Sequence, residues 1–137
     1  MRLSKTSEYA LRILIYMAKA PDTLYSASHL IEKLNVSDKY LRRLMTDLCK
    51  SGFIQSIQGR EGGYRFIRDT REIFIYDVIN SVENLDKLSG CVLGLDKCSC
   101  ENPCAMHDTW LKVRSQIDKV YRETRLSDLD FNNTYRY

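Results

Sequence analysis

The sequence predicts a mainly α-helical protein that carries one small β-hairpin. Apolar residues recur every three or four positions in several serine-led stretches, the spacing of helices with one buried face. Two short β-prone runs, 53–57 and 64–67, flank a glycine-rich turn. A later stretch, at about 105–124, has the periodicity of one long helix. This order of elements is typical of a winged helix-turn-helix followed by a long C-terminal helix.

The first helix should begin near Ser4 or Thr6 and end at about Lys19. Five residues at helical spacing form its expected buried stripe: Tyr9, Ala10, Ile13, Leu14 and Met17. Glu8 falls in the first turn, where a carboxylate suits the positive end of the helix dipole. The helix is therefore expected to lie against the core along one face.

A second, short helix should follow a cap at Ser26 or Ser28 and lead through a turn at 35–36 into a third helix capped by Ser37. The expected buried face of the third helix consists of Tyr40, Leu41, Leu44, Met45 and Leu48. Gly52 should end this helix, because glycine enters the left-handed conformation at little cost. Two short helices joined by a tight turn form a helix-turn-helix unit.

Cations are concentrated on the third helix and on the hairpin that follows it. Gly59, Gly62 and Gly63 permit a tight turn at the tip of this hairpin. A winged helix meets DNA with a helix in the major groove and a basic hairpin on the adjacent backbone. A single exposed cation is often merely solvated, but together these side chains predict DNA contacts: Lys39, Tyr40, Arg42, Arg43, Arg60, Arg65, Arg2 and Lys5.

The distribution of charge favours the same interpretation. Residues 1–68 hold twelve Lys and Arg against six Asp and Glu, a balance of +6. Residues 69–137 hold nine against twelve, a balance of −3, and the whole chain carries +3. The first half therefore suits a polyanion such as double-stranded DNA, and the second half does not.

Other classes of protein fit the sequence less well. No stretch approaches the roughly 18 apolar residues of a membrane span, and Arg12 interrupts the early apolar run, unlike an export signal. We therefore expect a cytoplasmic protein with reduced thiols and no membrane partner. The chain has no phosphate-binding loop, nucleophile–base pair or HExxH motif, so we expect no enzyme. A small redox protein is the alternative from another class.

A loop of about twenty residues, from 83 to 103, holds three of the five cysteines, and a fourth, Cys104, follows it directly. Loops of this length are usually functional or disordered. The candidate metal ligands are Cys91, Cys98, Cys100, Cys104 and His107. Their spacing differs from the CxxC pairs of zinc fingers. Clustered thiolates select iron–sulfur clusters, zinc or copper(I), and a metal-free thiol–disulfide switch is a further alternative. Cys49 stands apart and is expected to be a small buried hydrophobe.

The long C-terminal helix should begin near Ala105 or Asp108 and end at about Thr124, after a connector and a helix near 76–82. Its apolar residues recur at three and four positions: Trp110, Leu111, Val113, Ile117, Val120 and Tyr121. Because the winged helix is already complete, we expect a second copy of this helix to cover that face in a two-fold homodimer. Packing back on its own domain is the alternative.

Four stretches of the chain are specific in combination: MRLSKTSEYALRILIYMA, DKYLRRLMTDLCKSGFI, GREGGYRF and IFIYDVINSVE. They resemble the bacterial Rrf-two-type winged-helix transcriptional regulators, which include IscR-like and NsrR-like members. The resemblance covers nearly the whole chain and fades only after Arg125. It implies a homodimeric repressor or activator in which each third helix reads half of a palindromic operator.

The resemblance also implies a cofactor. In cluster-binding members three loop cysteines hold a two-iron or four-iron iron–sulfur cluster, and by position these are Cys91, Cys98 and Cys104 here. The fourth ligand falls on His107 in IscR-like members and on Glu8 of the partner subunit in NsrR-like members. Cys100 is an additional thiol that could replace a ligand or act in oxidation. Such a cluster would sense redox state, nitric oxide or iron–sulfur status, and aerobic purification could remove it.

These observations divide the chain into five expected segments. They are a DNA-binding region at 1–68, a connector and helix at 69–90, a sensor loop at 91–107, a dimerisation helix at 108–125 and a C-terminal tail at 126–137, which is expected to begin with a short capped turn of helix at 126–131.

Overall fold

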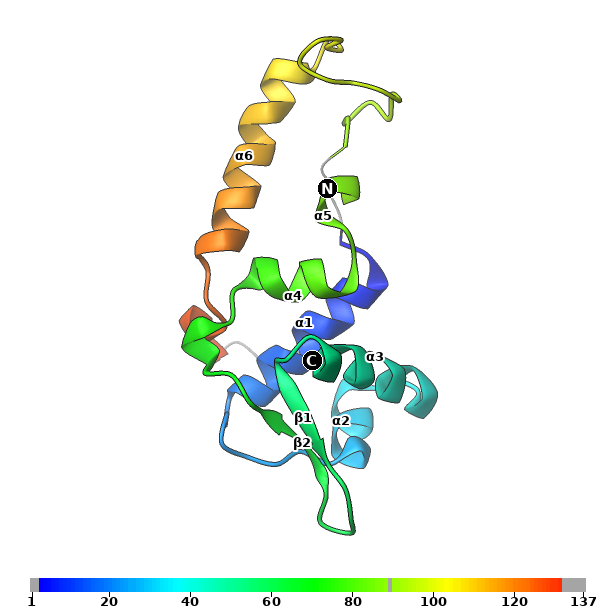
Figure 1. Ribbon diagram of the computed structural model, residues 1–137, viewed down its shortest axis with the longest axis vertical. Coiled ribbons are helices and arrows are strands. Elements are labelled where there is room, and N and C mark those ends of the chain that lie inside the picture. Colours follow the sequence, from blue (N-terminus) through cyan, green and yellow to red (C-terminus); the bar gives the residue numbers. More distant parts are fainter. Residues whose placement is uncertain (1–2, 89, 132–137) are drawn as a thin grey trace.

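The structure, a computed structural model, describes residues 3–88 and 90–131. Its elements follow one another as drawn in Figure 1: α1 (Lys5–Ala18), α2 (Ala27–Leu34), α3 (Asp38–Lys50), β1 (Ile54–Ile57), β2 (Gly63–Phe66), the 3-10 turn η1 (Thr70–Glu72), α4 (Ile75–Val82), α5 (Leu85–Leu88), α6 (His107–Glu123) and the 3-10 turn η2 (Leu126–Asp128). The predicted fold class, mainly α-helical with a small β-hairpin, is confirmed.

Serine side chains fix where the first three helices begin. Ser4, Ser26 and Ser37 each accept a hydrogen bond from the backbone N–H three residues further on. Of the two caps considered for the second helix, Ser26 is the one that the structure uses. Helix α3 ends at Lys50, and Gly52 follows it with a left-handed φ of 82°. The local sequence therefore sets the boundaries of the helix-turn-helix.

Helix α1 packs against α2, α3 and α4 and supplies the centre of the core. The buried side chains of this core come from α1 to α5, β1, η2 and the segments that connect them; those of the first three helices include Ala10, Ile13, Leu14, Met17, Leu30, Leu41, Met45 and Leu48. Tyr9, predicted to be buried with the α1 stripe, is only partly buried at the edge of the core. Leu126, in the segment expected to be a tail, is fully buried. The chain after α6 therefore returns to the core.

Strands β1 and β2 form an antiparallel hairpin in which Ile54 pairs with Phe66 and Ile57 with Gly63. The segment before α2 adds a third partner, because the backbone groups of Tyr25 and Tyr64 exchange hydrogen bonds of 2.9 and 2.8 Å. Gly63 lies against this segment so closely that a Cβ there would approach the Tyr25 carbonyl carbon to 2.7 Å. The wing is thus anchored to the chain that leads into the helix-turn-helix.

Helix α6 and the cysteine loop extend from the core at the end opposite to the hairpin (Figure 1). Across the described part of the chain, no side chain of α6 is buried. At its foot the Arg122 guanidinium stacks over the Tyr76 ring of α4, 3.8 Å from the ring centroid. The segment predicted to be one loop from 83 to 103 contains the short helix α5, because Leu85 turns into the core. No helix within residues 3–88 and 90–131 is long and apolar enough to cross a membrane.

Candidate DNA interface and metal centre

The predicted DNA-reading cations lie on the exposed side of α3 and on the wing. Lys39, Arg42 and Arg43 are exposed on α3, Arg60 is exposed in the hairpin turn, and Arg65 is exposed on β2. The Arg42 Nε lies 2.7 Å from Asp38 Oδ1, one turn back on the same helix. Because both side chains of this pair are largely exposed, the pair is weak and leaves Arg42 able to exchange partners.

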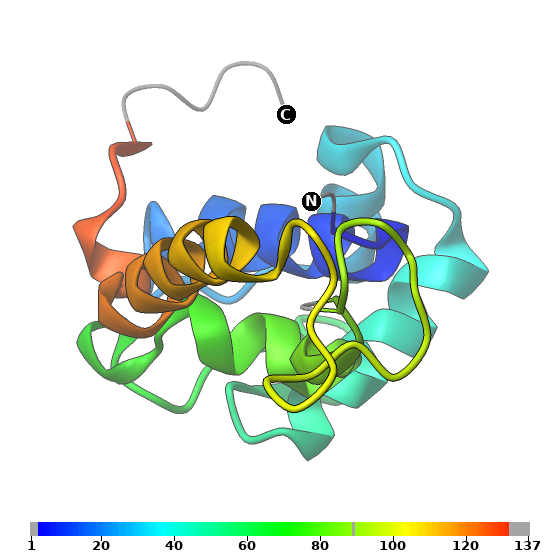
Figure 2. The same ribbon diagram turned by 90° about the horizontal axis from the view of Figure 1, so that it is seen from above.

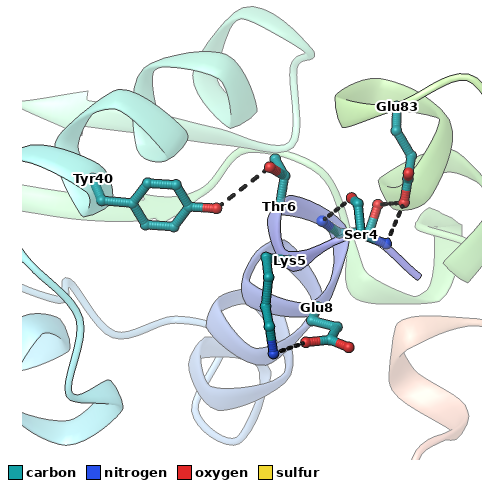
Figure 3. Close-up of polar contacts among 7 residues, drawn as sticks. Ser4, Lys5, Thr6, Glu8, Tyr40 and Glu83 are labelled. Carbon is teal, nitrogen blue, oxygen red and sulfur yellow. Dashed lines mark hydrogen bonds and ion pairs between the residues drawn. The ribbon is translucent and has the colours of Figure 1, made fainter. Parts of the chain in front are cut away.

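Tyr40 and Lys5 have partners at the start of α1 (Figure 3). The Tyr40 hydroxyl donates a hydrogen bond of 3.4 Å to Thr6 Oγ1, and its ring meets the Tyr9 ring edge-on at 5.6 Å between centroids. Lys5 Nζ lies 3.0 Å from a Glu8 carboxylate oxygen. Tyr40 is therefore only half-buried between α1 and α3, although its place in the apolar pattern of α3 predicted a buried side chain. Arg2 lies outside the described residues.

Three of the predicted metal ligands converge. The sulfur atoms of Cys91, Cys98 and Cys104 all lie within 4.8 Å of one another. The Cys91 and Cys104 sulfurs are 3.5 Å apart, and the Cys98 sulfur is 3.5 Å from His107 Nδ1. Among the described residues, His107 Nε2 is buried without a hydrogen-bond partner. The loop thus gathers three thiols and one imidazole from residues up to sixteen positions apart.

Backbone geometry folds the loop around these side chains. The Trp110 indole N–H donates a hydrogen bond of 2.8 Å to the Gly90 carbonyl, which ties the start of the loop to α6. The Gly94 N–H closes a turn on the Cys91 carbonyl at 2.9 Å, with a left-handed φ of 70° at Gly94. Lys97, just before Cys98, is also left-handed, with φ of 60°. Sequence reasoning placed Trp110 only in an apolar stripe and missed this anchoring contact.

Electrostatics differ between the two neighbouring thiols. Backbone N–H groups of Leu95 and Leu93 hydrogen-bond to the Cys91 sulfur and lower the pKa of this thiol to about 7. Burial and the neighbouring Cys91 sulfur raise the pKa of Cys104. A sulfur that accepts backbone N–H groups is prepared to carry the negative charge of a thiolate ligand.

Two further candidate metal ligands, and the one cysteine that was not expected to be a ligand, lie apart from the three convergent sulfurs. Cys100 is exposed and does not belong to the convergent set. Glu8 lies on the first turn of α1, beside Lys5 rather than beside the cysteines of its own chain. Cys49 is half-buried on α3, and burial raises the pKa of its thiol, in keeping with the packing role expected for it.

The donor set fits an iron–sulfur cluster. Thiolates are the ligands that such clusters prefer, and a histidine nitrogen can replace one of them. The three convergent sulfurs supply the thiolates, and the buried imidazole of His107 borders the same site. A cluster held here would supply redox chemistry and reactivity towards oxidants and nitric oxide.

Taken together, a helix-turn-helix, a basic wing and a long C-terminal helix define a DNA-binding transcriptional regulator. The sequence profile of the Rrf2 family, described as an iron-dependent transcriptional regulator, matches residues 3–130. A protein of Aquifex aeolicus (strain VF5), named as an HTH-type transcriptional regulator, is 31% identical over 131 residues, which are 94% of this chain and 91% of that protein. The chain belongs to the Rrf2 family, as its resemblance to Rrf-two-type regulators predicted, and it is not an enzyme.

Solved structures have the same fold. CymR, the global cysteine regulator of B. subtilis, is 27% identical with a TM-score of 0.76, and the match covers 93% of this chain and 95% of that one. IscR of T. potens is 24% identical with a TM-score of 0.72, covering 93% and 85% of the two chains.

Proposed function

We propose that this chain is a homodimeric, sequence-specific regulator whose cysteine loop holds an iron–sulfur cluster, and that the state of the cluster sets the affinity for an operator. The observation that carries the proposal is the convergence of the Cys91, Cys98 and Cys104 sulfurs within 4.8 Å of one another. This convergence occurs in a family described as iron-dependent. In this proposal 1–68 is the DNA-binding unit, 91–107 the sensor and 108–125 the dimerisation helix.

For DNA, we place α3 in the major groove and the hairpin on the flanking backbone. Lys39, Arg42 and Arg43 would then face bases or nearby phosphates, and Arg60 and Arg65 would face phosphates. The remaining candidates, Tyr40, Lys5 and Arg2, would contact the backbone beside the groove. Two copies related by a two-fold axis would read a palindromic operator, with half-sites one helical turn, about 34 Å, apart.

The exposed face of α6 supports the dimer. Val113 is 43% exposed and Val120 is 58% exposed, seven residues apart on one side of the helix. Between them Ile117 continues the stripe at helical spacing. A second α6 packed against this stripe would remove these apolar side chains from water.

For the cluster, the proposed ligands are Cys91, Cys98 and Cys104, with His107 as the fourth. Glu8 of the partner subunit and Cys100 are the alternative fourth ligands. His107 is favoured because its Nδ1 already lies 3.5 Å from the Cys98 sulfur and its other nitrogen is buried.

The regulation follows from linkage. Drawing the ligand atoms together fixes the loop against the first turn of α6, where His107 begins the helix. The cluster can raise operator affinity only if it binds more tightly to the conformation that binds DNA than to the conformation that does not. The change in operator affinity is limited by that difference in binding free energy. Coupling free energies of roughly 1–3 kcal/mol are typical and correspond to a 5–150-fold change in affinity.

A single zinc ion is a second candidate that one distance favours. Zinc–sulfur bonds of about 2.3 Å place two tetrahedral ligands roughly 3.8 Å apart, close to the 3.5 Å between the Cys91 and Cys104 sulfurs. The same two thiols would form the disulfide of a metal-free switch.

Anaerobic purification followed by iron, sulfide and zinc analysis separates these candidates. We expect iron and acid-labile sulfide in the parent protein and neither in the Cys91→Ala, Cys104→Ala double variant. Genomic fragments selected with the loaded protein should then bind the loaded and metal-free forms with different affinities. Stoichiometric zinc without sulfide would replace the cluster with a zinc site. Equal operator affinity of the loaded protein and the double variant would remove the regulatory role.

A further inference from the structure

The first turn of α1 is held by a residue that is distant in the sequence and follows α4 (Figure 3). Glu83 directly follows α4, and its Oε1 accepts a hydrogen bond of 3.3 Å from the Ser4 N–H and a second from the Ser7 hydroxyl. Ser7 is fully buried, and its own N–H donates to the Ser4 hydroxyl oxygen. A carboxylate here satisfies N–H and O–H groups at the positive end of the α1 dipole.

Glu83 also marks the point where the chain leaves α4 for α5 and the cysteine loop. Burial and the negative charge of Glu83 together raise the pKa of Tyr121 at the foot of α6, so this carboxylate also lies near α6. Figures 1 and 2 both place the cysteine loop on the side of the molecule where α1 begins. Glu83 therefore joins the segment that carries the loop to the first turn of α1.

On its other side, this turn contacts α3. Thr6, next to Ser7, accepts the hydrogen bond from the Tyr40 hydroxyl at 3.4 Å (Figure 3). Tyr40 belongs to the first turn of α3, between the exposed cations Lys39 and Arg42. The contact between α1 and α3 is thus made at the N-terminal end of α3, the helix that faces DNA in the proposed function.

We propose that Glu83 is a positioning residue that couples the cysteine loop to the recognition helix α3 through the first turn of α1. A shift of the chain at Glu83 moves the two serines that it holds, and Thr6 carries this shift to Tyr40. These hydrogen bonds form a contiguous network, which is one physical route by which two sites can be coupled. The coupling free energy is what the experiments below measure. The inference rests on the proposed function for its signal, the state of the cluster, but its contacts are those of the polypeptide alone.

Two substitutions interrupt this network at different points. Glu83→Gln keeps an acceptor oxygen and the packing but removes the charge that strengthens both hydrogen bonds. Thr6→Val keeps the shape and removes the acceptor for Tyr40. Glu123→Gln, at an exposed carboxylate of α6, makes the same charge change elsewhere and serves as the control. Melting curves check that all three variants fold.

The first measurement is the ratio of operator affinities with and without the cluster. We expect Glu83→Gln and Thr6→Val to lower this ratio by at least about fivefold, the lower end of typical allosteric coupling, and to retain iron and sulfide. Glu123→Gln should keep the parent ratio. A parent-like ratio in both Glu83→Gln and Thr6→Val overturns the proposal, since a merely structural role would change stability and leave the ratio intact.

The second measurement needs no cluster. Amide hydrogen exchange of metal-free Glu83→Gln should speed up in the first turn of α1 and also in the first turn of α3. An increase confined to α1 overturns the coupling. A parent protein whose operator affinity does not depend on the cluster would end the proposed regulation, while hydrogen exchange would still decide whether Glu83 reaches α3.

Discussion

The indole N–H of Trp110 lies 2.8 Å from the carbonyl oxygen of Gly90, twenty residues earlier in the chain. Gly90 precedes Cys91, and Trp110 lies one turn after His107. This one hydrogen bond therefore sets the first and last candidate ligands of the loop against the same helix. Preorganisation of this kind lowers the entropy that a bound group must remove from its ligands.

Removing the donor should loosen the loop. Trp110→Phe keeps an aromatic ring on α6 but loses the hydrogen bond, which contributes roughly 0.5–1.5 kcal/mol. We expect the cluster to be lost to an iron chelator about two- to tenfold faster than from the parent, as followed by visible absorbance under nitrogen. Metal-free Trp110→Phe should still unfold in one cooperative transition, with a free energy of unfolding at most about 1.5 kcal/mol below that of the metal-free parent. Identical rates of cluster loss would show that Trp110 does not organise the site.

The apolar stripe of α6 gives a prediction about assembly. Val120→Glu places a charge at a position that is 58% exposed in one chain and covered in the proposed dimer. We expect sedimentation velocity to show dimers of the parent and monomers of Val120→Glu at micromolar concentration. Lys112→Gln changes the net charge by the same amount off the stripe and should stay dimeric. A dimeric Val120→Glu would place the interface elsewhere.

The parts of the fold that the sequence predicted are those governed by neighbouring residues. Ser4, Ser26 and Ser37 cap their helices through bonds that span three residues, and Gly52 ends α3 by its own conformational freedom. The cysteines were recognisable as candidate ligands from their chemistry and clustering. The resemblance to Rrf-two-type regulators singled out Cys91, Cys98 and Cys104, and these are the three whose sulfurs converge. Spacing alone did not select them, because the convergence depends on turns at Gly94 and Lys97 that the amino-acid pattern does not specify.

Contacts between distant segments were not accessible in this way. A short turn of helix was expected from Leu126 and is present as η2, but its place in the core was not: the Leu126 N–H donates to the Ile73 carbonyl at 2.7 Å and the side chain is fully buried. Glu83 looked like the start of a loop, yet it holds the first turn of α1. Each has a partner more than fifty residues away, and neither carries a periodicity or a motif that points to that partner.

The wing offers a test of packing. Gly63→Ala would place a Cβ 2.7 Å from the Tyr25 carbonyl carbon and 3.1 Å from the Ser26 nitrogen, both of them backbone atoms that cannot rotate away. We expect a loss of about 1–3 kcal/mol in the free energy of unfolding, measured in urea, because overpacking forces the backbone to shift. Glu61→Ala, at an exposed position of the same turn, should stay within about 0.5 kcal/mol. Equal stabilities of the two variants would contradict the close approach.

The connector between the wing and α4 gives a dependence on pH. The Arg71 guanidinium and backbone N–H hydrogen-bond to the Asp69 carboxylate at 2.6 and 2.9 Å and lower its pKa from 3.8 to about 2. Because the folded pKa is the lower one, the stabilisation is present above pH 4 and is lost as the pH falls towards 2. Asp69→Asn should therefore melt below the parent at pH 7 and approach it near pH 2. Glu123→Gln should not show this pattern, and a difference that persists at pH 2 would assign the effect to packing.

The two arms of the DNA interface should respond differently to substitution. Arg43→Ala, on α3, should cost about 1–3 kcal/mol at the preferred operator and relax the preference for one base pair, since a base-reading arginine discriminates between sequences. Arg60→Ala, in the hairpin turn, should weaken all duplexes alike and reduce the slope of log K against log salt by about 0.9, the share of one phosphate contact. Lys119→Ala, a cation on α6, should change neither quantity. Fluorescence anisotropy with operator and scrambled duplexes at several salt concentrations measures both, and a parent protein with no salt dependence would remove α3 and the wing as the DNA-binding surface.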